Sequence, residues 1–341
     1  MLNREKRTST LLLTARQIEG LLQMKEVISA VESAFRYKGL GKVDMPPKSY
    51  LTFTEHNGDL RTMPSYIPDL GVAAVKVVNS HPDNFKRHNM RTVMATLILV
   101  DPETGAPISY MDATLLTGMR TGAASAVASK YLAIRDPKVL GVIGAGNQAK
   151  TQIEALMTYY GGFEEIRVND HFSEKARELA SHFRRVYGDE DLGDIRAVPS
   201  PEDCVRGADI VVTATPSRRP IVKDEWVSEG VHFNCIGADA PGKQEMDPAI
   251  LRRAMVVVDD WEQASHSGEI NIPLANGQIS KDHIHAEIGQ IVAGLSPGRE
   301  NRRQVTVFCS TGLAVQDAVT AKLIYEKAVE RGIGTSIQIL P

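Results

Sequence analysis

The chain has 341 residues, of which 43% are hydrophobic and 24% charged, and its formal net charge is −3. This length suggests two domains, and the weak negative charge gives no general attraction to nucleic acid or anionic membranes. The apolar run Leu11–Leu13 near the charged N-terminus is too short for a signal sequence, and no stretch reaches the roughly 18 apolar residues of a membrane span. We therefore expect a cytoplasmic protein without nucleic-acid or membrane partners.

The three cysteines are widely separated and form no CxxC pair. Apolar residues surround Cys204, Cys235 and Cys309, so we predict buried free thiols and no disulfide framework. The nine histidines show no metal-ligand spacing, and no metal is expected.

The first part of the chain predicts one helix followed by a hairpin-rich sheet. Residues 15–39 carry Leu, Ile and Val on one helical face. Short alternating runs follow, separated by turn sequences such as Asn57-Gly58, and they predict a mostly antiparallel sheet. Small residues and leucine in Thr114–Leu132 predict a helix that leads into the next domain. The expected strands are Ser49–Thr54, Asp59–Met63, Ala73–Asn79, Val93–Val100 and Ala106–Asp112.

From residue 139 to about residue 260, strand and helix patterns alternate, which is typical of a parallel α/β sheet. Nearly continuous apolar strands predict burial on both faces. Helices are expected at Ser173–Tyr187 and Pro201–Gly207. The expected strands are Val139–Ile143, Ile166–Asn169, Ile195–Val198, Ile210–Thr213, His232–Ile236 and Met255–Val258.

The first of these strands runs into the pattern Gly144-Ala-Gly-Asn-Gln-Ala149, which opens a helix from Gln148 to about Tyr160. Gly144 allows a tight turn, and Gly146 has no side chain to keep a pyrophosphate from the backbone. The first amides of the helix can bind phosphate. Asp170 ends the second strand, 26 residues after Gly144, near the position of the acid that accepts the adenine-ribose hydroxyls. These features predict a Rossmann fold that binds NAD, since a carboxylate at this position repels the 2′-phosphate of NADP.

The C-terminal part predicts a strand at residue 306, a glycine turn and a long helix over residues 318–329. This tail can extend the parallel sheet or return to the first domain, and we favour the return. The fold class is therefore α/β, with a discontinuous α+β domain (residues 1–125 and 312–341) and a Rossmann domain (residues 126–311). The site is expected in the cleft between them.

The first domain supplies the cations that could hold a carboxylate. Lys76 stands among valines and alanines, on the same strand face as Ala74 and Val78, so its charge must be paired or its pKa lowered. Lys48, Arg61 and Arg120 are further candidates, and the alternative for each is a surface cation whose stem lies along apolar side chains.

In the nucleotide domain, Asp239 follows an apolar strand, at the edge where parallel sheets bind ligands. A turn or helix-cap carboxylate is the alternative. Thr213 and its neighbours end the preceding strand and would line the nicotinamide half of the site.

Together these segments resemble the ornithine cyclodeaminase/μ-crystallin family over nearly the whole chain. The resemblance implies homodimers that contact through the discontinuous domain, a Rossmann domain carrying NAD(P), and reactions on small amino or imino acids. It rests on the motifs Met45-Pro-Pro-Lys48, Asp59-Leu-Arg-Thr-Met-Pro64, Lys76-Val-Val-Asn-Ser-His-Pro82, Met119-Arg-Thr-Gly-Ala-Ala124, Gly144-Ala-Gly-Asn-Gln-Ala149, Gly237-Ala-Asp-Ala-Pro-Gly-Lys243 and Ser310-Thr-Gly-Leu-Ala-Val-Gln-Asp317.

One position bears on the substrate. Ornithine cyclodeaminases carry a glutamate three residues before the proline that matches Pro64, and this chain has Arg61 there. A cation would repel the distal ammonium of ornithine and suits the carboxylate of a short acid. Arg61 and the motifs around it resemble the archaeal type of alanine dehydrogenase, from which the chain departs at Cys309, where that type has aspartate.

The resemblance implies an NAD-dependent L-alanine dehydrogenase, with a ketimine or pyrroline-2-carboxylate reductase and an ornithine cyclodeaminase as alternatives. A non-catalytic NAD(P)-binding protein is a further alternative, disfavoured because Lys76 and Asp239 are both present. By resemblance Lys76 and Asp239 are catalytic, and Lys48, Arg61 and Arg120 bind substrate. The cofactor-binding residues implied are Thr92, Thr121, Gly144, Gly146, Asn147, Gln148, Asp170, Thr213, Thr215 and Ala238.

Overall fold

A computed structural model describes residues 9–339 of the chain, without the side chains of residues 189–192. The charged residues 1–8, which bear on the expected absence of a signal sequence, lie outside the described residues. The chain forms two compact units, one containing the residues up to Arg120 and from Leu313 onward, the other Thr121–Gly312. The sequence placed these boundaries after residues 125 and 311. Each unit is described by itself below.

The first unit contains a seven-stranded sheet in the order β17-β1-β6-β5-β4-β3-β2. All neighbours are antiparallel except β1 and β6, as the hairpin-rich sequence predicts. Two short strands near the ends of the described chain, β1 and β17, were not predicted from the sequence. The strands are β1 (Ser9–Leu13), β2 (Ser49–Phe53), β3 (Gly58–Ile67), β4 (Val72–Ser80), β5 (Val93–Val100), β6 (Pro107–Asp112) and β17 (Thr335–Gln338).

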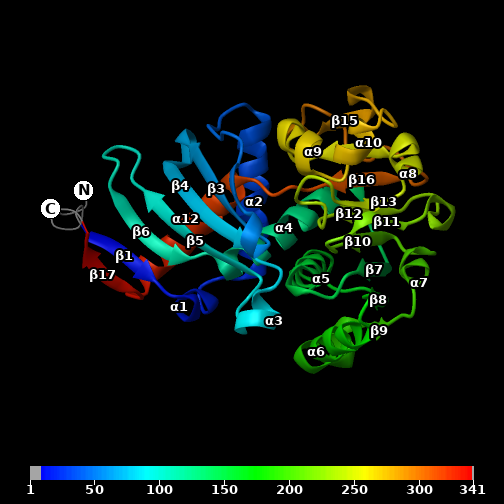
Figure 1. Ribbon diagram of the computed structural model, residues 1–341, viewed down its shortest axis with the longest axis horizontal. Helices are drawn as coiled ribbons and strands as arrows, with labels where there is room; N and C mark the ends of the chain where they lie inside the picture. Colours follow the sequence, from blue (N-terminus) through cyan, green and yellow to red (C-terminus); the bar gives the residue numbers. More distant parts are fainter. Residues whose placement is uncertain (1–8, 340–341) are drawn as a thin grey trace. The chain divides into compact units, whose positions relative to one another are not determined.

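The prediction of one helix over residues 15–39 is wrong. Residues 20–23 are not helical, and they separate α1 (Ala15–Glu19) from α2 (Met24–Gly39). The short α3 (Asn84–His88) follows β4. The long α12 (Ala314–Glu330) packs against α2 and against β3, β4 and β5 (Figure 1). Burial alternates along β4, with Ala74, Lys76 and Val78 buried on one face, as the sequence predicted.

The second unit contains an eight-stranded sheet in the order β15-β14-β16-β12-β10-β7-β8-β9. All its strand pairs are parallel, and the order reverses beside β7, the first strand of the unit. This is the doubly wound arrangement, which confirms the predicted α/β class. The strands are β7 (Val139–Ile143), β8 (Glu165–Asn169), β9 (Asp194–Ala197), β10 (Ile210–Thr213), β12 (His232–Cys235), β14 (Met255–Val258), β15 (Ile284–Glu287) and β16 (Thr306–Cys309).

The tail divides between the two arrangements that the sequence left open. Its strand β16 lies in the parallel sheet between β12 and β14. The prediction that the tail returns to the first domain is therefore wrong for this strand. Its helix α12 belongs to the first unit. The turn at Gly312, with φ of +79°, joins them.

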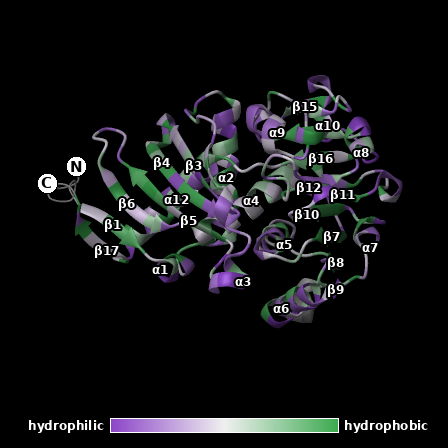
Figure 2. Cartoon of the chain, in the orientation of Figure 1, coloured by the Kyte–Doolittle hydropathy of each residue, from purple (hydrophilic) through white to green (hydrophobic). Residues whose placement is uncertain are grey.

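Both faces of the parallel sheet are buried. Within β10, Val211 belongs to one apolar cluster and Ile210 and Val212 to another, so alternate side chains enter opposite cores. Figure 2 shows these strands as largely hydrophobic, and α6 with mixed polarity. All three cysteines are buried and free, as predicted. Among the described helices, none is both long and apolar enough to cross a membrane.

The remaining helices connect these strands. Helix α4 (Thr114–Leu132) has the predicted bounds, and α6 includes a kink at Gly188. The second unit also contains a small two-stranded sheet, in which β11 (Arg218–Val222) pairs with β13 (Gln244–Met246). The other helices are α5 (Asn147–Tyr160), α6 (Ser173–Leu192), α7 (Pro201–Val205), α8 (Pro248–Arg253), α9 (Trp261–Ser267), α10 (Asn271–Ala275) and α11 (Ile288–Val292).

Candidate functional site

A buried ion cluster lies in the first unit, where α4 and α12 bring charged groups to the inner face of β4. The Lys76 ammonium lies 2.8 Å from each carboxylate oxygen of Asp317. Arg120 Nε donates to the same carboxylate at 2.8 Å, and its Nη1 donates to Gln316 Oε1 at 3.0 Å. Lys76, Asp317 and Gln316 are at most 1% exposed, and Arg120 is 5% exposed. The cluster therefore combines two cations with one carboxylate.

Burial and, next in size, the positive charge of Arg120 lower the pKa of Lys76 from 10.5 to about 7, although the carboxylate of Asp317 acts in the opposite direction. Lys48, which is half-buried before β2, also lowers this pKa. A lysine that titrates near neutral pH can exchange a proton during a reaction. The prediction that its charge must be paired or its pKa lowered is confirmed in both respects.

Arg61 lies on β3 with its side chain nearly buried. It forms a two-point ion pair with Asp59, at 2.9 Å from Nε to Oδ1 and 3.0 Å from Nη2 to Oδ2. Its guanidinium carbon also lies 5.5 Å from the centre of the Tyr50 ring. In the antiparallel register Arg61 opposes Val78, two residues from Lys76 on the same face of β4. The two cations are therefore diagonal neighbours on one sheet face.

The glycine loop of the second unit has the geometry that a dinucleotide requires. Gly144 has φ of +104°, and a Cβ there would lie 2.6 Å from the Ala214 carbonyl oxygen. A Cβ on Gly146 would meet nothing within 4 Å, which leaves the space that a pyrophosphate needs. Asn147 and Gln148 begin the 14-residue helix α5, whose first amides and dipole favour an anion. These residues fit a dinucleotide.

Asp170 follows β8 beside this loop. Its Oδ2 accepts the N–H of Ala145 at 2.8 Å, and its Oδ1 accepts the N–H of Phe172 at 2.9 Å. The carboxylate is thus fixed by backbone donors next to the glycine turn.

The loops after β10 and β12 are joined by Glu245, a residue that the sequence analysis did not select. It accepts hydrogen bonds from Thr213, Thr215 and Gly237. Asp239, in the loop after β12, is partly exposed and lies 2.5 Å from the ammonium of Lys243.

The other predicted residues are distributed over both units. Thr92 is exposed before β5, and its carbonyl accepts the N–H of His81 at 2.7 Å. Thr121 is buried in α4, where its carbonyl accepts the Gln152 side chain, and Ala238 is buried beside Gly237. The structure brings Lys76 and Arg120 onto one carboxylate and places Arg61 on the same sheet face as Lys76. Asp317 was not predicted as a site residue, although it ends the motif that begins at Ser310.

The fold and this geometry define the class, a dinucleotide-binding protein whose second unit has the Rossmann-type fold and whose first unit carries the buried cluster of Lys76, Arg120 and Asp317. The model of the ornithine cyclodeaminase/mu-crystallin family matches residues 8–332, and the chain belongs to this family. It is 47% identical to an alanine dehydrogenase of Archaeoglobus fulgidus over 96% of this chain and 98% of that protein.

Two solved structures are similar over their whole length. An archaeal alanine dehydrogenase dimer with bound NAD has a TM-score of 0.92 and 46% identity, covering 97% of this chain and 100% of that one. The Δ1-pyrroline-2-carboxylate reductase of Thermococcus litoralis, in complex with NADH and L-proline, has a TM-score of 0.92 and 43% identity, covering 96% and 100%.

Proposed function

We propose that this chain is an NAD-dependent L-alanine dehydrogenase, active as a homodimer. It would convert L-alanine, water and NAD⁺ into pyruvate, ammonium, NADH and a proton. The observation that carries the proposal is the buried cluster of Lys76, Arg120 and Asp317, whose cations suit a small carboxylate and whose lysine titrates near pH 7. The similarity to the alanine dehydrogenases, one of them a dimer with NAD, supports it.

The proposal gives each candidate residue a role in the amination direction. Arg61, with Lys48 or Arg120, holds the carboxylate of pyruvate. Lys76 polarises the keto oxygen and donates a proton to the hydroxyl that leaves as water. Asp239 exchanges protons with ammonia. When bound, NADH supplies the hydride that completes the reduction.

The cofactor preference depends on Asp170. Its carboxylate, fixed by two backbone N–H groups, would accept the adenine-ribose hydroxyls and repel a 2′-phosphate. We expect a higher kcat/KM with NADH than with NADPH, and equal values would remove the basis for this preference.

A second candidate is reduction of a preformed cyclic imine, favoured by the similarity to the T. litoralis reductase. The same cations suit pyrroline-2-carboxylate. An ornithine cyclodeaminase activity is disfavoured because Arg61 would repel the distal ammonium of ornithine.

The deciding experiment follows NADH oxidation by the purified protein with pyruvate, with and without ammonium, and with pyrroline-2-carboxylate alone. Oxidation that needs both pyruvate and ammonium is the expected result. Turnover of the cyclic imine without turnover of pyruvate would overturn the alanine assignment in favour of the reductase.

A further inference from the structure

Glu245 connects two loops of the second unit through a single buried carboxylate. It lies on β13, at 0% exposure. Its Oε1 accepts both the N–H and the hydroxyl of Thr215, each at 2.7 Å. Its Oε2 accepts the Thr213 hydroxyl at 2.8 Å and the N–H of Gly237 at 2.9 Å. Four donors, from the last residue of β10, the loop after it and the loop after β12, therefore converge on this one side chain.

These two loops follow neighbouring strands of the parallel sheet, β10 and β12. They are in direct contact, because a Cβ on Gly237 would lie 2.1 Å from the Thr215 carbonyl oxygen and 2.6 Å from Glu245 Oε2. The first loop also touches the glycine turn through Ala214. In a doubly wound sheet the dinucleotide spans the point where strand order reverses, here between β7 and β10. The adenine half then lies on the side of β8, and the nicotinamide half on the side of β10 and β12.

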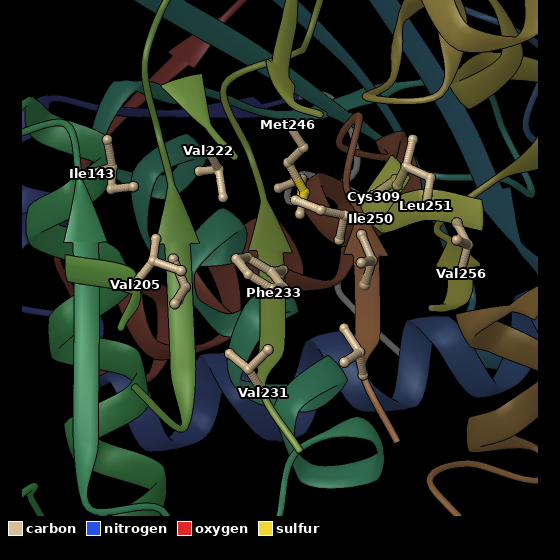
Figure 3. Close-up of a cluster of buried hydrophobic side chains, with 14 of the residues drawn as sticks. Ile143, Val205, Val222, Val231, Phe233, Met246, Ile250, Leu251, Val256 and Cys309 are labelled. Carbon is tan, nitrogen blue, oxygen red and sulfur yellow. The ribbon is translucent and has the colours of Figure 1, made fainter. Parts of the chain in front are cut away.

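The backbone of Glu245 is itself held by hydrogen bonds to a second buried carboxylate, that of Glu269. Glu269, which is 1% exposed, accepts the N–H of Glu245 at 2.9 Å and the N–H of Met246 at 2.7 Å. The Met246 side chain enters the apolar cluster that also holds Phe233 and Cys309 (Figure 3). The carboxylate therefore projects from a rigid base, as precise positioning requires.

We propose that Glu245 is a positioning residue that holds the loops after β10 and β12 as one platform for the nicotinamide half of the dinucleotide, an inference that rests on the cofactor assignment of the proposed function. Glutamate suits this task and glutamine does not. Each carboxylate oxygen accepts one backbone N–H, from Thr215 or from Gly237. In either orientation of a glutamine amide, its NH₂ group would face one of these N–H donors, and that loop would lose its partner.

The test compares binding of NADH with binding of ADP, which lacks the nicotinamide half, by isothermal titration calorimetry. For Glu245→Gln we expect the Kd of NADH to rise about tenfold or more, while the Kd of ADP stays within about twofold, because only one half of the site is disturbed. The matched control is Glu229→Gln, which removes an exposed partner of Arg303 in the same unit and should change neither value. A general loss of folding would weaken both ligands equally.

A milder variant keeps the proposal testable if Glu245→Gln fails to fold. Thr213→Val removes one hydroxyl donor of nearly the same shape, and we expect a rise of about threefold for NADH alone. Unchanged NADH affinity in the folded variants, or an equal loss for both ligands, would overturn the positioning role. Wild-type protein that binds no NADH would overturn the proposed function as well, so the two failures are distinguishable.

Discussion

The two buried polar clusters of this protein balance their charges in different ways. In the first unit, Lys76 and Arg120 share the carboxylate of Asp317, so opposite charges compensate one another. In the second unit, Glu245 and Glu269 are like charges, and among the described residues no cationic side chain is paired with either. They are held instead by hydroxyl and backbone N–H donors.

This difference separates two functions of buried charge. An ion cluster with excess positive charge leaves one group, Lys76, with a pKa of about 7, and such a group can transfer protons. Burial raises the pKa of both Glu245 and Glu269, and the negative charge of Glu245 further raises that of Glu269. The four hydrogen bonds to Glu245 oppose the rise and favour its carboxylate form. The second cluster therefore fixes backbone geometry.

The largest effect is expected when the first cluster loses Lys76, the group proposed to transfer protons. Lys76→Met should lower kcat by about 10²–10⁴-fold, the usual contribution of a positioned acid or base, as measured by NADH oxidation with the preferred substrate. The control is Lys42→Met, since Lys42 is an exposed lysine paired with Asp69. Turnover of the Lys76 variant within a few-fold of the wild type would contradict its catalytic role.

The next effect is on stability. Asp317→Asn leaves two buried cations without their carboxylate, and breaking a buried pair in this way costs about 3–5 kcal/mol. We expect the denaturant midpoint of unfolding to fall strongly at pH 6. A midpoint close to that of the wild type would show that Asp317 does not compensate the cluster.

The stability lost in Asp317→Asn should also depend on pH. Since the pKa of Lys76 is about 7 in the folded protein and 10.5 is its ordinary value, the unfolded chain binds more protons between these pH values, and stability rises with pH across this window. Asp317 raises the pKa of Lys76, so Asp317→Asn moves the lower edge of the window to lower pH. The loss of stability should therefore be smaller at pH 9 than at pH 6, and a constant loss would exclude this linkage.

Arg61 sharpens the comparison within the first unit, because its ion pair with Asp59 lies beside the buried cluster. Arg61→Gln should raise the KM for pyruvate about 10- to 100-fold and change kcat less, since the role proposed for Arg61 is to bind the substrate carboxylate. Asp59→Asn retains the guanidinium, and we expect a change within about threefold. A larger effect on kcat than on KM for Arg61→Gln would argue against simple carboxylate binding.

The extent of sequence-based prediction differs between the same two regions. The six strands predicted between residues 139 and 258 were located to within one residue at each end, since nearly continuous apolar runs such as Ile210–Thr213 are typical of strands buried on both faces. The short strands β11, β13 and β15 of the same unit were not predicted. In the first unit, period-two alternation also predicted the buried position of Lys76. Its partner could not be found in this way, because Asp317 is 241 residues away and strand periodicity does not specify which helix covers a sheet face. Glu245 was missed for a similar reason, since its donors lie at the end of β10 and in the loops after β10 and β12.

The smallest effect is expected from the second cluster, and it should have the opposite dependence on pH. A carboxyl group whose pKa is raised in the folded protein binds more protons there than in the unfolded chain, so stability falls as pH rises above about 4.5. Glu269→Gln removes this titration and keeps an oxygen for the N–H groups of Glu245 and Met246. We expect a denaturant midpoint close to that of the wild type at pH 5 and equal or higher at pH 8. A marked loss of stability at pH 8 would mean that Glu269 is needed as a charged group, which contradicts a raised pKa of this carboxyl group in the folded protein.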